Sequence, residues 1–178
     1  VANGKLLCEN IFDDIWIQPA AGDAGGALGC ALLAEYSSGN QQFHSQKTRP
    51  CGSYWGPQYS TVYIKEYLEK RQCVYHEIVE SGILFDKIAQ LLDEQKIIGL
   101  FHGRMEFGPR ALGNRSIIAD PRSSEMQSRL NLKIKYRESF RPFAPSVLEE
   151  DVTKYFELDK KSPYMLLVSN VKKDLRKE

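Results

Sequence analysis

The sequence predicts an α/β fold from two observations. Short apolar runs typical of buried strands, such as "KIIGLFHG" at 96–103, alternate along the chain with amphipathic helical segments such as 82–95. The 178 residues are 42% hydrophobic, enough for a folded core, and no apolar run approaches the roughly 20 residues that a membrane span needs. We therefore expect a soluble, cytoplasmic protein.

The N-terminal segment predicts two helices and one strand. Residues 3–12 are expected to end a helix, 14–19 to form a strand and 25–37 to form a second helix. Residues 37–60 are rich in Ser, Gly, Gln and Pro and look like a linker, so a domain boundary is placed after residue 48. The segment before the linker buries too little apolar surface to be stable alone. We expect it to be part of a larger protein.

The rest of the chain again alternates strands and helices. One face of the helix at 82–95 is apolar, and the helix after 122 is expected to have Ser123 as its N-cap. In order, we expect a helix at 61–71, a strand near 73–76, the helix at 82–95, a strand in 96–103, a turn at Gly108-Pro109, a strand at 115–120, a helix from Ser123 to about Lys133, and strands at 143–148 and 164–171.

Charge and cysteine usage exclude several classes of function. The net charge of +1 argues against binding polyanions over the whole surface, but residues 101–145 hold nine basic against four acidic side chains. The four cysteines form no C-x-x-C pair and have no histidine at ligand spacing, which favours reduced thiols over a zinc site or a disulfide framework. The three histidines, at 44, 76 and 102, adjoin no nucleophile motif and are interpreted as structural.

The stretch "FHGRMEFGPRALGNRSIIADPR" at 101–122 carries four arginines beside two glycine-containing turns. Gly108 and Gly113 frame Arg110, and Pro109 restricts the local backbone, so the guanidinium would be held in a defined direction. Arginine is the side chain best suited to bidentate recognition of phosphate or carboxylate. Three interpretations stay open: a phosphate-bearing small molecule, a nucleic-acid backbone, or a solvated basic loop.

A second basic stretch, "NLKIKYRESFRPFAPSVLEED", follows at 131–151. If 133–137 is extended, Lys133, Lys135 and Arg137 point to one face. Arg141 precedes a proline, which disfavours helix at that position. A solvated basic edge strand is the alternative, and the interleaved aromatic residues could instead stack the bases of a single nucleic-acid strand or lie in the core.

The stretch "QPAAGDAGGALGCALLAEY" at 18–36 runs from the expected strand into a glycine-rich helix start. Its glycines permit close approach of a nucleotide phosphate or, alternatively, close packing of the helix. Asp23 follows the strand, where it could offer a carboxylate to a metal or serve as the helix N-cap.

Three motifs together resemble a known family. "VANGKLL…FDDIWIQPAAGDAGGALGCAL", "GRMEFGPRALGNRSIIADPR" and "KYRESFRPFAPSVL" are similar to the O-carbamoyltransferases of the nodulation and antibiotic-tailoring type. The resemblance implies an N-terminal ASKHA-fold (Kae1-like) domain and a C-terminal YrdC-like α/β domain with a twisted mixed sheet. Residues 1–48 would then be the C-terminal remnant of the Kae1-like domain plus a linker, and 49–178 a truncated YrdC-like domain.

The same resemblance implies a two-step activity. The YrdC-like domain would convert carbamoyl phosphate and ATP into carbamoyl adenylate, and the Kae1-like domain, with a bound metal, would pass the carbamoyl group to a hydroxyl acceptor. The implied cofactors are ATP and Mg²⁺, with Fe²⁺ as an alternative metal in the full-length enzyme. The implied partners are a small-molecule acceptor and the missing N-terminal domain, with no membrane and no nucleic acid. An RNA-binding module using the same basic surface is the alternative hypothesis.

The family motifs assign roles to individual residues. We expect the isolated chain to be inactive in acceptor transfer. The catalytic candidates are Arg110, Lys135 and Arg141; the substrate- and cofactor-binding candidates are Arg104, Arg115, Asn114, Ser116, Gly22, Gly25 and Gly26; and the metal-ligating candidate is Asp23.

Overall fold

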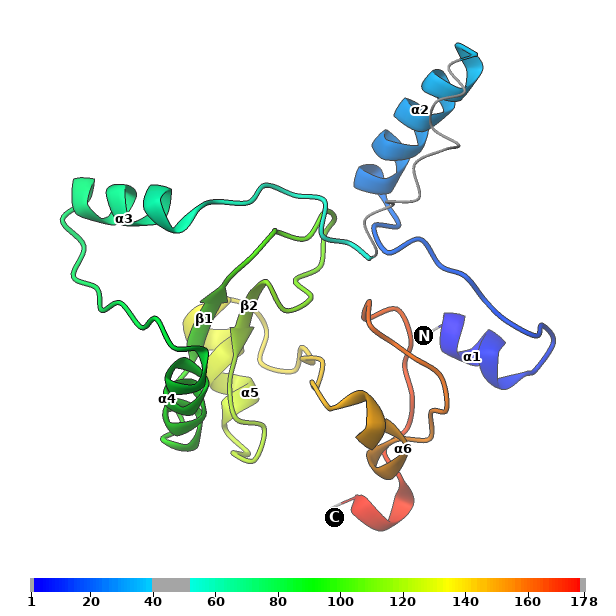
Figure 1. Ribbon diagram of the computed structural model, residues 1–178. Helices are drawn as coiled ribbons and strands as arrows, with labels where there is room; N and C mark the ends of the chain where they lie inside the picture. Colours follow the sequence, from blue (N-terminus) through cyan, green and yellow to red (C-terminus); the bar gives the residue numbers. More distant parts are fainter. Residues whose placement is uncertain (1, 40–51, 177–178) are drawn as a thin grey trace. The chain divides into compact units, whose positions relative to one another are not determined.

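The computed structural model describes residues 2–39 and 52–176 and divides into two compact units (Figure 1). The first unit comprises the described residues up to Trp55, together with Glu106–Leu112 and the chain from Ser146 onward. The second comprises Gly56–Met105 and Gly113–Pro145. The expected linker and the boundary after residue 48 fall largely on residues 40–51, and these, with His44 and Cys51, lie outside the described residues.

A two-stranded antiparallel sheet lies at the centre of the second unit. Strand β1 is Ile98–Phe101 and strand β2 is Arg115–Ile118, so the strands predicted in 96–103 and at 115–120 are confirmed. Ile98 pairs with Ile118 and Phe101 with Arg115, and Figure 1 shows the two strands side by side. The chain is therefore mixed α/β, as the alternation of apolar patterns predicted, although its sheet is small.

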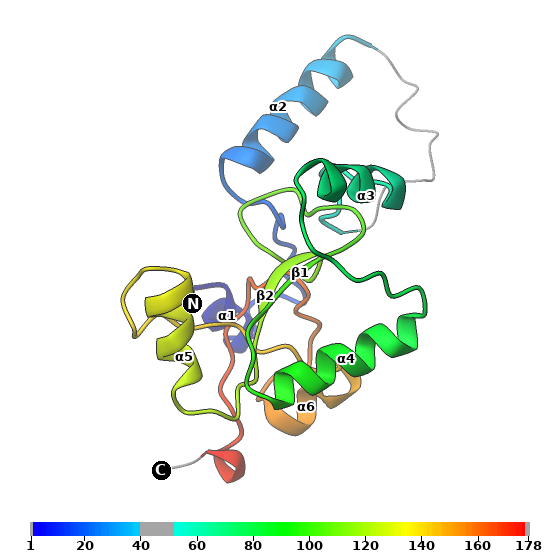
Figure 2. The same cartoon turned by 90° about the vertical axis from the view of Figure 1, so that its left-hand side faces the viewer.

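Helices α3 (Thr61–Lys70) and α4 (Ser81–Asp93) confirm two more predictions of the sequence. In Figure 2, α4 is seen from the side and runs across the direction of the two strands. Each helix stops one or two residues earlier than expected because a glutamine with positive φ follows it, Gln72 at 54° and Gln95 at 59°. The amide of Lys96 then donates to the carbonyl of Leu91, which closes a Schellman motif at the end of α4.

The last helix of the second unit begins later than predicted. Helix α5 is Met126–Arg129, and a π-helical turn, Leu130–Ile134, continues it. Ser123 is not the N-cap: its carbonyl accepts a hydrogen bond from the amide of Met126, and Glu125 holds the cap position. Lys133 lies in the π-helical turn, so 133–137 is not an extended strand, and the expectation of three cations on one strand face is wrong.

The first unit joins the two ends of the chain. Its helices are α1 (Ala2–Cys8) and α2 (Asp23–Ser37), with the short helix α6 (Val152–Tyr155) between two single-turn 3₁₀ helices, Glu149–Asp151 and Lys173–Leu175. The side-chain amide of Asn3 donates to the carbonyl of Leu166 at 3.1 Å, and the Lys160 ammonium donates to the carbonyl of Asp13 at 3.1 Å. The N-terminal segment therefore lies against the C-terminal one within this unit.

Four of the predicted strands do not form. The segments 14–19, 73–76, 143–148 and 164–171 contain no strand, although Val171 makes an isolated antiparallel bridge with Phe156. A strand needs a neighbour for its backbone groups, and an apolar run in the sequence does not say whether one is present. At 143–148 the flanking Pro142 and the internal Pro145 also lack the amide that a ladder requires.

The described residues bury few apolar side chains. Ala20, Met126 and Leu130 are the buried ones, so the described residues form a smaller core than the 42% hydrophobic composition would allow. On the apolar face of α4, Ile83 remains 55% exposed. A two-stranded sheet with short helices covers too little area to enclose these side chains. None of the described helices is long and apolar enough to cross a lipid bilayer.

Helix α3 offers a direct test of the local structure, because its N-cap bond is simple. The hydroxyl of Ser60 accepts a hydrogen bond from the amide of Tyr63 at 3.2 Å. Ser60→Ala should lower the free energy of opening of α3 by about 1 kcal/mol, and Ser60→Gly by only a few tenths. Native-state hydrogen exchange of the α3 amides measures both. Unchanged exchange of the α3 amides in Ser60→Ala would show that the hydroxyl does not cap the helix.

Candidate functional site

Arg110 lies on the loop Glu106–Leu112. Hydrogen bonds fix the backbone of this loop at both ends. Glu106 is only 3% exposed, and its carboxylate accepts the backbone amide of Leu112 at 2.7 Å. The amide of Phe107 donates to the carbonyl of Ser53 at 2.6 Å, at the start of the same loop. The arginine itself is exposed. The loop therefore presents a cation from a backbone fixed at both ends.

This Arg110 loop packs against the segment that leads into α2. Gly108 has φ of 121°, and a Cβ atom at that position would lie 2.9 Å from the Cβ of Ala20. Glycine is required there both by the backbone conformation and by the close approach. Ala20 is buried and lies two residues before Gly22. Two stretches that the sequence singled out separately, the Arg110 loop and the glycine-rich helix start, thus come together in the first unit.

The glycines at the start of α2 have different surroundings. Gly22 is the N-cap of the helix. A Cβ on Gly25 would lie 2.5 Å from the carbonyl oxygen of Ala20, so Gly25 serves close packing of the preceding turn. Around Gly26 the corresponding position is open space. The position beside Gly22 is open as well, so Gly22 and Gly26 both leave room for another group and Gly25 does not.

Asp23 is the first residue of α2, and the N-cap role considered for it is wrong because Gly22 holds that position. Its exposed carboxylate lies at the positive end of the helix dipole, which favours an anion. Across 2–39 and 52–176, no group of three or more His, Cys, Asp or Glu side chains could hold a metal ion. Asp23 could supply one oxygen ligand, but the described residues do not fit a complete metal centre by themselves.

Three of the expected substrate-binding residues bond to nearby atoms of the second unit. The Arg104 guanidinium donates to the carbonyl of Gly56 at 2.9 Å, and the Asn114 amide donates to the carbonyl of Arg104 at 2.8 Å. The Ser116 hydroxyl accepts the amide of Gly113 at 3.0 Å. Arg115 lies in β2, paired with Phe101. These residues shape the turns at the end of the hairpin.

The remaining two catalytic candidates lie beyond the π-helical turn. Lys135 caps that turn, and its exposed ammonium group has no hydrogen bond or ion pair with any residue that the structure describes. The guanidinium of Arg141 pairs with Glu138 at 3.0 Å. The backbone amide of Glu138 itself, and after it this pairing with Arg141, lower the pKa of the Glu138 carboxyl. Both partners are more than half exposed. Exposed pairs contribute little, so an anionic ligand can replace Glu138 at Arg141.

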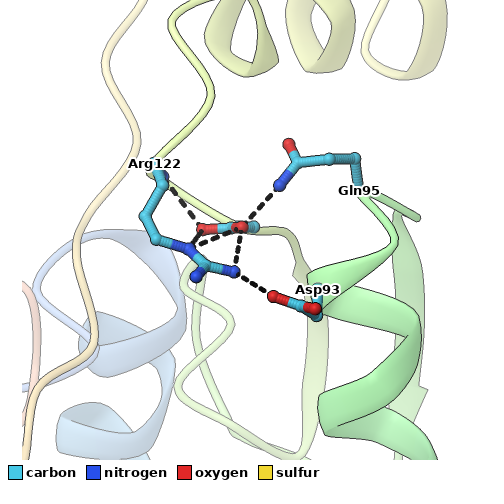
Figure 3. A network of polar contacts seen from close by, with 4 residues as sticks. Asp93, Gln95 and Arg122 are labelled. Atoms are coloured by element: carbon cyan, nitrogen blue, oxygen red, sulfur yellow. Dashed lines mark hydrogen bonds and ion pairs between the residues drawn. The ribbon is translucent and has the colours of Figure 1, made fainter.

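An ionic network around the buried carboxylate of Asp120, which sequence reasoning missed, joins the end of α4 to the end of β2 (Figure 3). Asp120 is 5% exposed and accepts hydrogen bonds from the backbone amide and the Nε of Arg122, both at 2.9 Å, and from Gln95 at 2.5 Å. Arg122 also reaches Asp93 at 2.7 Å. The side-chain and backbone bonds from Arg122 lower the pKa of Asp120 to about 2. Arg122 is thus structural, and an Asp two residues before an Arg was the available signal.

Comparison with known proteins identifies the family. Residues 89–178 match the family described as "Carbamoyltransferase C-terminus", and residues 1–32 match "Carbamoyltransferase N-terminus". The chain belongs to the carbamoyltransferase family. Arg110, Lys135 and Arg141 fall in the C-terminal match of this carbamoyltransferase chain, whereas the glycine-rich start of α2 and Asp23 fall in the N-terminal match.

Several curated proteins are similar to this carbamoyltransferase chain over nearly all of its length. The "Uncharacterized protein sll1178" of Synechocystis sp. is 55% identical over 99% of the chain and 29% of the relative. Nodulation protein NolO of Bradyrhizobium diazoefficiens is 43% identical over 96% of the chain and 31% of the relative. Nodulation protein NolNO of Sinorhizobium fredii is 42% identical over 98% and 26%. The chain therefore spans about a quarter to a third of these relatives.

The Asp120 network predicts a specific dependence of stability on pH. The folded carboxyl has a pKa of about 2, below its ordinary value of 3.8, so it binds a proton less readily than in the unfolded chain. Its contribution is complete above about pH 4 and is lost as the pH falls through about 2. In urea unfolding between pH 5 and pH 2, the stability gap between wild type and Asp120→Asn should narrow as acid is added.

The matched control is Asp93→Asn, which removes a carboxylate that is 75% exposed in the same network. This variant keeps Asp120 and should lose stability in acid as the wild type does. A gap between wild type and Asp120→Asn that stays constant from pH 5 to pH 2 would contradict the assignment.

Proposed function

We propose that the chain is part of an O-carbamoyltransferase and contributes cationic ligands to the site at which carbamoyl phosphate and ATP form carbamoyl adenylate. The observation that carries the proposal is the Arg110 loop: an exposed arginine on a backbone fixed by buried Glu106 and packed against the glycine-rich start of α2. Membership of the carbamoyltransferase family and the nodulation proteins among its relatives support the assignment.

The proposed reaction needs several fixed cations. Water releases phosphate from carbamoyl phosphate and leaves carbamate, whose oxygen then attacks the α-phosphorus of ATP while pyrophosphate departs. Carbamoyl phosphate, carbamate and ATP are all anions, so their mutual repulsion and the charge at the transferring phosphorus must be offset by cations held in place beforehand. No protein nucleophile is required.

Three residues of this chain take the cationic role. Arg110 contributes a guanidinium suited to bidentate contact with phosphate oxygens, and Lys135 contributes a point charge that no residue described in the structure neutralises. Arg141 exchanges its exposed pairing with Glu138 for an anionic oxygen of the substrate. Arg104, Asn114, Arg115 and Ser116 have a supporting role, since their contacts shape the hairpin end.

The cofactor and the remaining domains belong to the same proposal. ATP enters with Mg²⁺, and the open space at Gly26 suits the backbone side of a nucleotide. Asp23 supplies one ligand to the metal of the acceptor-transfer step, Mg²⁺ or Fe²⁺, with the other ligands coming from outside the described residues. The proposal assigns the first segment to a Kae1-like ASKHA domain and the rest to a YrdC-like domain, with the hydroxyl acceptor bound mainly by the N-terminal domain.

Exchange of labelled pyrophosphate into ATP tests the proposal in the full-length parent protein. The wild type should show exchange that depends on carbamoyl phosphate. Arg110→Ala and Lys135→Ala should each weaken the binding of carbamoyl phosphate by roughly 1.5 to 3 kcal/mol, the range for hydrogen bonds to charged groups, and suppress the exchange. The matched controls are Arg71→Ala on the end of α3 and Lys87→Ala on α4, which should leave exchange unchanged.

Two results would count against this proposal. Full exchange in the folded Arg110→Ala and Lys135→Ala variants would remove both side chains from the site. Absence of exchange in a folded, metal-loaded parent, together with RNA binding that falls steeply with salt and ignores carbamoyl phosphate, would favour a nucleic-acid-binding module on the same basic surface.

A further inference from the structure

We propose that Asn131 is a positioning residue that holds the segment 132–141 in the conformation in which Lys135 and Arg141 meet an anionic ligand. The inference rests on the proposed function for the identity of that ligand, carbamoyl phosphate. It assigns to a buried, uncharged side chain a role that the two basic residues cannot fill for themselves. The inference concerns the basic segment 132–141, which belongs to the second unit.

Asn131 is fully buried, with 0% of its surface exposed, and it has the lowest exposure of any buried residue that the structure describes. Its amide nitrogen donates to the carbonyl of Ser139 at 3.0 Å and to the carbonyl of Arg141 at 2.8 Å. Its amide oxygen accepts the Nε of Arg137 at 2.7 Å. Both N–H donors and the oxygen acceptor of the Asn131 side chain therefore form hydrogen bonds to the single loop 132–141.

A second amide side chain acts on the same backbone from the preceding helical turn. Gln127 donates to the carbonyl of Arg141 at 3.1 Å and to the carbonyl of Phe140 at 3.3 Å. The carbonyl of Arg141 thus receives two side-chain donors, Gln127 from the surface and Asn131 from the interior. Pro142 follows and restricts the backbone further. The root of the Arg141 side chain is fixed by these contacts.

The beginning of the segment is fixed by the backbone. The amide of Lys135 donates to the carbonyl of Leu130 at 2.9 Å, and the amide of Arg137 donates to the carbonyl of Asn131 at 3.0 Å. Between them, Tyr136 takes a left-handed conformation with φ of 49°, which a non-glycine residue adopts only where its surroundings require it. Asn131 therefore holds both ends of the loop, through its own carbonyl and through its side chain.

The arrangement separates two kinds of cation. Arg137 is bound by Asn131 and lies over the ring of Phe143, 5.0 Å from its centroid, so it belongs to the scaffold. Lys135 and Arg141 are exposed on that scaffold. Fixing the backbone before the ligand arrives reduces the ordering cost of binding, which is how a residue without ligand contact raises affinity.

Asparagine is specific for this role among side chains of similar size. Asn131→Asp keeps the volume and still accepts the bond from Arg137, but it replaces two donors by an oxygen that faces two carbonyl oxygens. The new carboxylate oxygen is buried without a donor, which is costly, so the loop must open to find water. The variant thus removes the loop contacts and retains the contact with Arg137.

The experiment uses the full-length parent protein and two readouts. Hydrogen exchange of the amides of Lys135, Arg137 and Arg141 reports the loop without any ligand, and titration with carbamoyl phosphate reports the site. In Asn131→Asp, we expect these amides to exchange at least about tenfold faster and the Kd for carbamoyl phosphate to rise about tenfold. The control Asn170→Asp, an exposed amide paired with Glu157 in the first unit, should change neither.

A double-mutant cycle separates positioning from general support of the fold. If Asn131 acts through Arg141, then Asn131→Asp should weaken binding little further once Arg141→Ala is present. Gln127→Ala, which removes only an exposed amide, should shift both readouts in the same direction by about two- to fivefold, and it serves where Asn131→Asp does not fold.

Each outcome decides a different claim. Unchanged exchange of the loop amides in Asn131→Asp, or in Gln127→Ala if that variant alone folds, would overturn the positioning role. So would independent, additive losses in the cycle with Arg141→Ala. A wild-type protein that binds no carbamoyl phosphate would overturn the proposed function, and the exchange rates would still decide whether Asn131 holds the loop.

Discussion

Buried polar side chains that bond to the backbone hold the functional loops of this chain. Glu106 closes the Arg110 loop through the amide of Leu112, and Asn131 closes the following basic segment through two carbonyls. Asp120 does the same at the end of β2 through the amide and side chain of Arg122. With so few apolar side chains buried, these bonds define loop geometry that packing alone would leave loose.

The same interactions divide the cations of the two basic stretches into structural ones and ones that a ligand can reach. Arg122 is hydrogen-bonded to Asp120, and Arg137 is hydrogen-bonded to Asn131, so both guanidinium groups are structural. Arg110 and Lys135 stay exposed, and Arg141 has only a surface pairing that an anion can displace. Net charge in the sequence therefore overstates the cations available to a ligand, because the count cannot distinguish a structural guanidinium from an accessible one.

Local patterns in the sequence predicted the elements that depend on local interactions. The helices α2, α3 and α4 and the two strands around 98–118 follow from apolar periodicity and from the residues at their ends. The predictions of strands at 14–19 and 164–171 were wrong. A strand depends on a neighbouring strand to pair with, and the periodicity of apolar residues does not show whether one is present. Sequence reasoning also missed that Gln72 and Gln95 adopt a left-handed backbone conformation after α3 and α4. Glycine is the usual residue just after the end of a helix, and neither position has one.

The candidate site divides in the same way. The motif residues Arg110 and Gly25 could be singled out from the sequence, but only the structure shows that Gly25 serves packing and that Gly108 lies against Ala20. The role of Asn131 could not be predicted from the residues next to it in the sequence. Its three hydrogen bonds join it to residues six to ten positions further on. They depend on a turn in a segment that sequence reasoning considered as an extended strand. Contacts that depend on the path of a loop are beyond reasoning from spacing.

The central claim is that the exposed cations of the second unit, Lys135 and Arg141, bind an anionic substrate. The most direct test is a crystal structure of the full-length parent protein with carbamoyl phosphate bound. The account predicts phosphate oxygens within hydrogen-bonding distance of Lys135 or Arg141, with the Asn131 bonds to the loop carbonyls retained. Carbamoyl phosphate bound elsewhere, with both cations facing solvent, would contradict it.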